Sequence, residues 1–163
     1  MVCRIKMTAA ALVVSCGFSV PANAQMAGAP PAPSPAMQAV EARKAIYTLI
    51  GSNFKPVGDV LRGRAQYDPA EVQKRATRIA FLAELASEAF PDASNSGLPA
   101  TRAKADIWKN RAEFDRRLKD FQEHARALAQ VAAGEKSATD AFKAAAVAVA
   151  QDCKGCHDSF REE

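Results

Sequence analysis

Two cysteines and a histidine lie within five consecutive positions near the end of the chain, in the stretch Cys-Lys-Gly-Cys-His at residues 153–157. Cysteines three residues apart in a helix share one face, and a histidine four residues after the first lies on that face too. Each thiol can add to one vinyl group of a haem, while the histidine binds the iron. The pattern predicts one covalent haem c, with Cys153 and Cys156 as thioether anchors and His157 as the axial iron ligand.

Two other roles of paired cysteines fit this sequence less well. A structural zinc site requires four ligands, and His124, the second histidine of the chain, has no metal-ligating partner spaced near it. We expect His124 at the surface, beside the apolar stripe of its helix. A thioredoxin-like redox pair follows a strand of a sheet, whereas this sequence predicts no strand. Haem attachment is the interpretation that uses both cysteines and His157.

The attachment residues lie at the end of the last of four segments with helical periodicity. These segments span roughly 35–55, 69–89, 100–132 and 137–161. In the last segment the cysteines continue an apolar stripe that includes Phe142 and Val149, so they are expected to face the core. Abundant alanine and few β-branched or aromatic residues also favour helices. We predict an all-α antiparallel four-helix bundle with the covalently bound haem in its interior.

Local signals predict the ends of the first two helices. Ser34 is expected to cap the first helix, with Pro35 in its opening turn. Pro56 and Gly58 are expected to stop that helix, because proline lacks the amide hydrogen that a helix interior needs. Asp68 is expected to cap the second helix.

The first 24 residues have the features of an export signal. A positively charged start precedes an apolar run, and cleavage is expected after Ala24. The predicted organisation is a signal peptide at 1–24, a Pro/Ala-rich linker at 25–36 and a four-helix haem domain at 37–163. Export predicts a periplasmic protein. An alternative is that Cys16 carries a lipid, and we expect membrane association only in that case.

The charge of the chain is nearly balanced. The full sequence carries 22 basic and 18 acidic residues, and removal of Arg4 and Lys6 with the signal leaves 20 against 18. The sequence contains no basic run and no patch of basic and aromatic residues, which are the features that indicate nucleic-acid binding. We therefore expect no nucleic-acid partner.

Three stretches give the chain a resemblance to a known family. They read ARKAIYTLIGSNF in the first helical segment, DIWKNRAEF in the third and CKGCHDSFR in the fourth. In these stretches the chain resembles the class II c-type cytochromes, and specifically cytochrome c′. The resemblance implies that Arg43 pairs with a haem propionate, a role that suits a guanidinium because it grips a carboxylate with two hydrogen bonds. It also implies that Arg161 lies beside the proximal histidine ring, where its charge influences the iron.

The resemblance places Tyr47 where low-spin relatives carry a methionine that binds the iron as second axial ligand. A phenol with a pKa near 10 ligates iron poorly without an activating group. Met37 lies about three turns from Tyr47 and would need a haem far from its family position, which leaves His124 as the alternative second ligand. We therefore expect a five-coordinate, high-spin iron with Tyr47 on its distal face. Ile46, Ile50 and Phe54 are expected to make that face apolar.

Such a face suits small gases, and the resemblance implies binding of nitric oxide and carbon monoxide. The alternative is a six-coordinate, low-spin electron-transfer cytochrome with a periplasmic redox partner. We expect no enzymatic activity, because no distal histidine–arginine pair for peroxidase chemistry is present. The resemblance also implies a homodimer through the first two helices. Val57, Val60, Leu61 and Tyr67 can either form that interface or cover the end of the bundle.

Overall fold

A computed structural model describes residues 32–95 and 101–162 of the chain. Within these residues the secondary structure is helical and no strand is present, which confirms the all-α prediction. The elements are α1 (Pro35–Leu61), α2 (Pro69–Ala86), the 3-10 turns η1 (Ser87–Ala89) and η2 (Asp92–Ser94), α3 (Asp106–Lys109), α4 (Arg111–Gly134) and α5 (Asp140–Phe160). The predicted signal peptide, Cys16 and most of the predicted linker lie outside the described residues.

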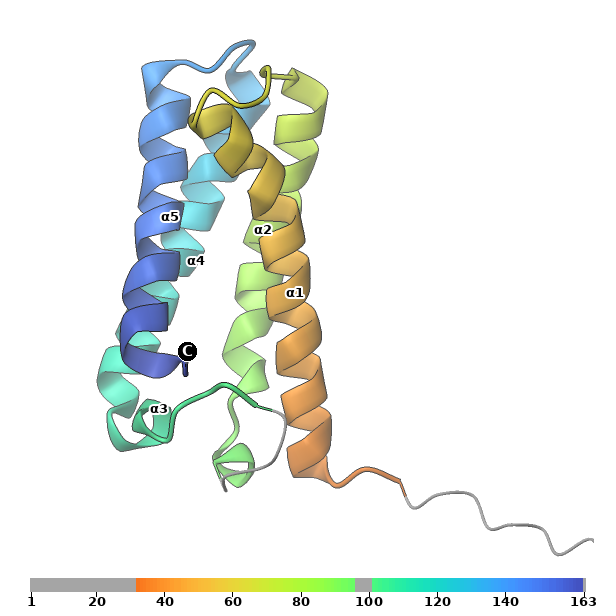
Figure 1. Cartoon of the computed structure of the whole chain (residues 1–163), viewed down its shortest axis with the longest axis vertical. Helices are drawn as coiled ribbons and strands as arrows, with labels where there is room; N and C mark the ends of the chain where they lie inside the picture. The colour runs from red at the N-terminus through yellow and green to blue at the C-terminus, as the bar shows by residue number, and fades with distance from the viewer. Residues whose placement is uncertain (1–31, 96–100, 163) are drawn as a thin grey trace, which may run out of the picture. The chain divides into compact units, whose positions relative to one another are not determined.

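The four long helices of this domain form an antiparallel bundle (Figure 1). Helix α1 packs chiefly on α2, α2 packs on α4, and α4 packs on α5, whereas α1 and α5 contact each other much less. The short helix α3 lies at the end of the bundle where α5 finishes (Figure 1). The predicted four-helix bundle is confirmed, with one of its four helix–helix seams left loosely packed.

Helix α1 is longer than the sequence predicts, because Pro56 lies inside it instead of ending it. Proline in a helix interior costs about 3 kcal/mol. The turn after Pro56 recovers this cost by burial, since Val57 is fully buried and Val60 is 9% exposed. The helix stops at Arg62 and Gly63, whose φ of 68° lies in the left-handed region that glycine adopts freely.

The helix starts follow from side chains that accept hydrogen bonds from free amide groups. Ser34 accepts from the Met37 amide at 3.3 Å and Asp68 accepts from the Glu71 amide at 3.1 Å, both as predicted. Helix α5 begins at Asp140, three residues after the predicted start, because Thr139 is its cap. The predicted third helix is interrupted at Asn110, which separates α3 from α4.

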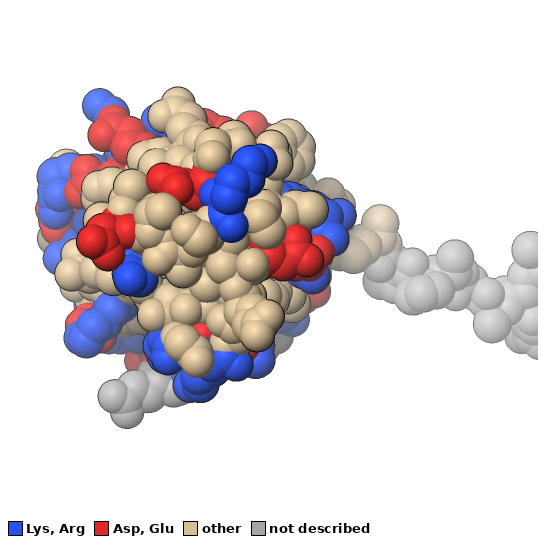
Figure 2. Space-filling view, turned by 90° about the horizontal axis from the view of Figure 1, so that it is seen from above, with Lys and Arg blue, Asp and Glu red and all other residues tan. Residues whose placement is uncertain are grey.

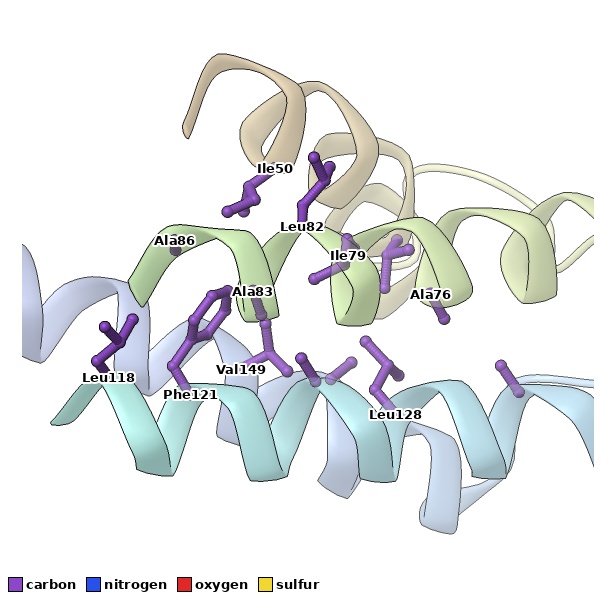
Figure 3. Packing of buried hydrophobic residues seen from close by; sticks show 14 of the residues in the cluster. Ile50, Ala76, Ile79, Leu82, Ala83, Ala86, Leu118, Phe121, Leu128 and Val149 are labelled. Atoms are coloured by element: carbon purple, nitrogen blue, oxygen red, sulfur yellow. The ribbon is translucent and has the colours of Figure 1, made fainter. Parts of the chain in front are cut away.

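The hydrophobic core is continuous between α1, α2 and α4 (Figure 3). Ile50 of α1 faces α2, and the α2 residues Ile79 and Ala83 lie between α1 and α4 (Figure 3). Leu128 and Val149 are fully buried where α5 joins this core. The close packing of this region holds α2 and α4 in place beside the loosely packed α1–α5 seam.

The end of the bundle away from α3, where the α1–α2 and α4–α5 connections lie (Figure 1), carries mixed charge (Figure 2). Basic and acidic side chains are interspersed around an uncharged centre (Figure 2). Asp59 accepts hydrogen bonds from Lys55, Arg62 and Arg64 at 3.2, 3.1 and 2.6 Å. These bonds lower the pKa of its carboxyl well below the ordinary range and tie down the end of α1. None of the described helices is long and apolar enough to cross a bilayer.

Candidate haem site

The loosely packed seam between α1 and α5 contains a cavity of about 520 Å³. This volume is within the range of sites for cofactors and other small ligands. Its walls are mostly apolar and come from α1, α4, α5 and the segments that precede α3. The main apolar lining residues are Ile50, Phe90, Ile107, Phe114, Leu118, Phe121 and Phe160. The cavity therefore suits a ligand with a large apolar body.

The structure brings Cys153, Cys156 and His157 to one wall of this cavity, at the end of α5. Both cysteines are free and half-buried. Burial raises the pKa of the Cys153 thiol to about 11 and also raises the pKa of the Cys156 thiol, where the Arg117 charge opposes the rise. Protonated thiols are poor nucleophiles for disulfide exchange, and these upward shifts are opposite to the lowered pKa typical of a redox dithiol.

His157 is exposed and lines the cavity. Its Nδ1 lies 3.3 Å from Arg161 Nη1. Partial loss of water contact against the cavity wall, followed by the charges of Arg161 and Arg102, lowers the pKa of the imidazole. A neutral imidazole is the form that binds a metal. Arg161 itself follows the last residue of α5 and donates its amide to the His157 carbonyl at 3.2 Å.

Arg43 enters the cavity from α1 and is the most informative side chain of the site. It is only 4% exposed, and its three guanidinium nitrogens find no hydrogen-bond partner among the described residues. Its Cζ lies 4.6 Å from the centroid of the Phe90 ring and 5.7 Å from that of Trp108. Burial lowers the pKa of Arg43. A buried cation without a partner is costly, so the cavity is built for a ligand that carries an anionic group.

Tyr47 lies one turn after Arg43 on the same wall and also lines the cavity. Its ring packs edge-on against Phe90, with centroids 6.1 Å apart. Burial raises the pKa of the phenol well above its ordinary value, with smaller contributions from the two cysteines. Tyr47 is therefore a neutral phenol at neutral pH. This state opposes the phenolate form that would ligate iron.

The expected apolar environment of Tyr47 is only partly correct. Ile50 lines the cavity as predicted, but Ile46 and Phe54 do not. Both are partly buried against the hydrophobic core instead. Phe90, which follows η1, takes their place beside Tyr47. No spacing pattern identifies Phe90, because it lies outside the periodic part of α2.

The other sequence candidates for an iron ligand lie away from the cavity. His124 is exposed on α4, as expected, and its Nδ1 is 2.7 Å from Asp152 Oδ2. Met37 is in the first turn of α1 and does not line the cavity. Neither residue is placed to bind a metal held by His157.

Sequence reasoning also missed Arg117. This α4 residue lines the cavity and donates from Nη1 to the Gly155 carbonyl oxygen at 2.6 Å. The local signal for it is the spacing of four residues from Glu113, whose carboxylate accepts from Arg117 Nε at 2.6 Å. No sequence pattern identifies the contact across 38 residues to Gly155.

The residues of this site fit a covalently attached haem. The apolar walls suit the faces of a porphyrin, the orphaned Arg43 guanidinium suits a propionate, and the two thiols lie on the same wall as a neutral imidazole. A bare metal ion is not favoured, since no group of three or more metal-ligating side chains occurs within 32–95 and 101–162.

Comparisons with known proteins agree with this chemistry. The family model of cytochrome c′ matches residues 38–161. Cytochrome c′ of Halomonas halodenitrificans is 34% identical over 129 residues, which cover 77% of this chain and 96% of the relative. The structure of cytochrome c prime from Shewanella frigidimarina matches with a TM-score of 0.74 at 33% identity, covering 81% of this chain and 100% of that one.

A further solved relative was captured with a ligand. The nitric oxide complex of a cytochrome c prime variant from Alcaligenes xylosoxidans matches with a TM-score of 0.68 at 30% identity, covering 78% of this chain and 97% of that one. Sequence, fold and site chemistry thus agree. The chain belongs to the cytochrome c′ family, and its cofactor is a covalently bound haem c.

Proposed function

We propose that this chain is a periplasmic, gas-binding cytochrome whose haem is anchored by Cys153 and Cys156, with His157 as the single protein ligand of the iron. When bound, haem supplies an iron that cycles between ferric and ferrous states and, with an open coordination position, takes up nitric oxide or carbon monoxide. The chain belongs to the cytochrome c′ family, and one solved relative was captured as a nitric oxide complex. The proposed function is gas binding of this kind and involves no enzymatic reaction.

The observation that carries this proposal is the composition of the cavity wall. His157 is the only histidine among the described residues that line the cavity, and none of those residues is a methionine. Lys44 also lines the cavity, but its ammonium group is paired with Glu41 at 3.1 Å. Tyr47 is held as a neutral phenol. The wall would therefore supply one good iron ligand, His157, and no second one of comparable strength.

Two arginines complete the proposed binding of the haem. Arg43 would donate to a propionate, which would remove the cost of its buried, unpaired charge. Arg161 remains 3.3 Å from His157 Nδ1 and keeps a positive charge beside the ring. That charge disfavours the imidazolium form. It therefore helps to keep the imidazole deprotonated and able to bind iron.

Tyr47 is proposed to control access to the open position. Its ring is fixed against Phe90, so it restricts the space available to an incoming molecule. Diatomic gases are small enough to enter such a site, and the nitric oxide complex of the Alcaligenes xylosoxidans relative supports the same ligand class here. The Tyr47 hydroxyl can also donate a hydrogen bond to a bound gas. Tyr47→Phe separates these roles because it keeps the ring and removes the hydroxyl.

Optical and resonance Raman spectra of the purified ferrous protein, before and after addition of carbon monoxide and nitric oxide, test the proposed function. We expect a high-spin, five-coordinate spectrum that changes on addition of either gas. Tyr47→Ala is expected to speed carbon monoxide binding by about tenfold or more, which corresponds to about 1.4 kcal/mol of barrier. A low-spin, six-coordinate spectrum that gas leaves unchanged contradicts the proposal and points to an electron carrier.

We also propose a homodimer that forms through α1 and α2. Val57 and Val60 are buried in the core, so they cover the end of the bundle and are not available for the interface. The exposed large apolar side chains of these helices are instead Leu49, at 49% exposure, and Phe81, at 64%. Sedimentation velocity of Leu49→Glu and Phe81→Glu tests this interface. Val147→Glu, on α5, is the matched control and is expected to leave the dimer intact.

A further inference from the structure

One hydrogen bond joins the haem-attachment segment, residues 153–157, to a neighbouring helix. Arg117 of α4 donates from Nη1 to the Gly155 carbonyl oxygen at 2.6 Å. Among the described residues no other side-chain or backbone hydrogen bond links residues 153–157 to a different element. Further contacts at this end of α5, such as the Lys104 amide to the Phe160 carbonyl at 3.0 Å, lie beyond the segment.

The Arg117 side chain is held in this position from two sides. Its Nε donates to Glu113 Oε1 at 2.6 Å, one turn earlier on α4. Its Cζ lies 5.9 Å from the centroid of the Phe160 ring, within the range of a cation–π contact. A planar guanidinium can bridge a carboxylate and a carbonyl with separate nitrogens, which an ammonium group does less well. The Arg117 guanidinium therefore reaches α5 in a defined orientation.

Gly155 leaves the space that this contact needs. A Cβ atom at position 155 would lie 3.0 Å from Arg117 Nη1, closer than ordinary van der Waals contact. A side chain at position 155 would therefore force the guanidinium to shift by a few tenths of an ångström. Glycine at position 155, between the two cysteines, thus allows Arg117 of α4 to approach the backbone of α5 closely.

Arg117 also borders the cavity, so its charge acts on whatever the cavity holds. We propose that Arg117 is a positioning residue for the haem, which fixes the attachment segment against α4 and places a permanent positive charge beside the cofactor. This inference rests on the proposed function, since it takes residues 153–157 as the haem anchor. Charge and hydrogen bonding around a haem are the means by which a protein sets its potential. A fixed cation near the iron favours the reduced state.

Arg117→Met tests this proposal in the haem-loaded protein, with Arg116→Met as the matched control. Arg116 is the adjacent residue and pairs with the same Glu113, but its other partner is Asp120 and it does not line the cavity. We expect Arg117→Met to lower the haem reduction potential and to shift the iron–histidine band in the ferrous resonance Raman spectrum. Arg116→Met is expected to change neither, and Arg117→Lys to restore the potential.

Gly155→Ala tests the contact without removing the charge. We expect it to shift the iron–histidine band in the unsubstituted background, because the new methyl group displaces the guanidinium. In the Arg117→Met background the same substitution is expected to have no further effect on the band, since the two changes remove one interaction. Circular dichroism of each variant establishes that it is folded.

The failure of this proposal is distinguishable from the failure of the proposed function. If the unsubstituted protein lacks covalent haem or shows a six-coordinate ferrous spectrum, the proposed function is wrong. If that protein is five-coordinate and Arg117→Met matches Arg116→Met in both potential and Raman band, the positioning role is wrong. An equal effect of Gly155→Ala in both backgrounds overturns the role of the contact in the same way.

Discussion

The α2–α4 seam and the α1–α5 seam of the bundle serve different purposes. Between α2 and α4 the facing side chains are apolar and fully packed, as at Ile79 and Leu128 (Figure 3). Between α1 and α5 the same kind of bundle leaves a cavity of about 520 Å³, with the unpaired cation of Arg43 in its wall. The first seam is complete with protein atoms alone, and the second requires a ligand.

This difference shows how a simple helical bundle gains a function. The apolar stripe of each helix is sufficient to close α1 on α2 and α2 on α4. The last seam keeps cysteine, histidine, arginine and tyrosine side chains where packing alone favours aliphatic ones. Stability and chemistry are thus divided between two seams, and substitutions in each are expected to have different signatures.

Loss of the haem anchor is expected to have the largest effect. In the Cys153→Ala/Cys156→Ala variant no thiol remains to form a thioether, so covalently bound haem falls to zero. The measurement is haem retained by the polypeptide after acidified-acetone extraction, with the mass of the intact chain as a second readout. Leu128→Ala, in the packed seam, serves as the control and is expected to keep its haem. Extraction-resistant haem in the double variant would contradict the assigned anchors.

A matched pair of leucines on α4 compares the two seams directly. Leu128 is fully buried in the packed seam, and Leu128→Ala is expected to cost about 2–5 kcal/mol in the free energy of unfolding without changing the haem spectrum. Leu118 is 9% exposed and borders the cavity, so Leu118→Ala is expected to alter the haem spectrum as well. Denaturant unfolding and absorption spectra of the haem-loaded variants check both. A spectrum changed by Leu128→Ala and unchanged by Leu118→Ala would reverse the assignment of the seams.

The effect of Arg43→Met on the free energy of unfolding is expected to have opposite signs in protein with and without haem. In haem-loaded protein it leaves a propionate without its partner, so the free energy of unfolding falls by about 1–3 kcal/mol. In the Cys153→Ala/Cys156→Ala variant after its haem has been extracted, it removes a buried, unpaired charge, so the free energy of unfolding rises by a similar amount. Denaturant titrations that compare Arg43→Met with its parent protein in each background measure this difference in the free energy of unfolding. A loss of stability in both backgrounds indicates that Arg43 has only a packing role.

The acid side of the stability profile provides the smallest and most specific test. Hydrogen bonds from Arg116 and then Arg117 lower the pKa of the Glu113 carboxyl to about 2, from an ordinary value of 4.5. The stability that these bonds supply is therefore complete above about pH 4.5 and is lost as the pH falls towards 2. We expect Glu113→Gln to be less stable than the unsubstituted protein at neutral pH and to converge with it near pH 2.

Denaturant unfolding across that pH range checks this expectation. Between pH 4.5 and 2 the proton uptake on unfolding is expected to be smaller in Glu113→Gln by up to about one proton. Glu123→Gln is the matched control. Glu123 lies on the same helix, and its Oε1 is 3.9 Å from Lys119 Nζ. We expect this variant to show the same dependence of unfolding free energy on pH as the unsubstituted protein. If the plots of unfolding free energy against pH were parallel for Glu113→Gln and the unsubstituted protein, the hydrogen bonds of Glu113 would not be made in solution.

Much of the fold follows from local pattern. The apolar stripes and the caps at Ser34 and Asp68 predict the bundle and two of its helix starts, because these signals act within a few residues. Pro56 was misleading, since the gain from burying Val57 against distant helices exceeds the local cost of the proline. Long-range burial of this kind has no local signature.

The residues of the site also fall into those that a local sequence pattern predicts and those that it does not. Cys153, Cys156 and His157 were identified from spacing along one helix, whereas Arg43 and Tyr47 required the resemblance of the first helical segment to a known family. Phe90 and Arg117 were missed, because their contacts join residues that are far apart in the sequence. Sequence patterns predict the groups that carry the chemistry, but they do not predict the side chains that hold those groups in place.

A crystal structure of the haem-loaded protein, with anomalous data collected at the iron edge, tests the central claim most directly. We predict one iron peak per chain in the cavity between α1 and α5, bound by His157 on one side and with Tyr47 near the open side. We also predict that a haem propionate accepts hydrogen bonds from Arg43. An iron outside this cavity, or one with a second protein ligand, would contradict the proposed five-coordinate site.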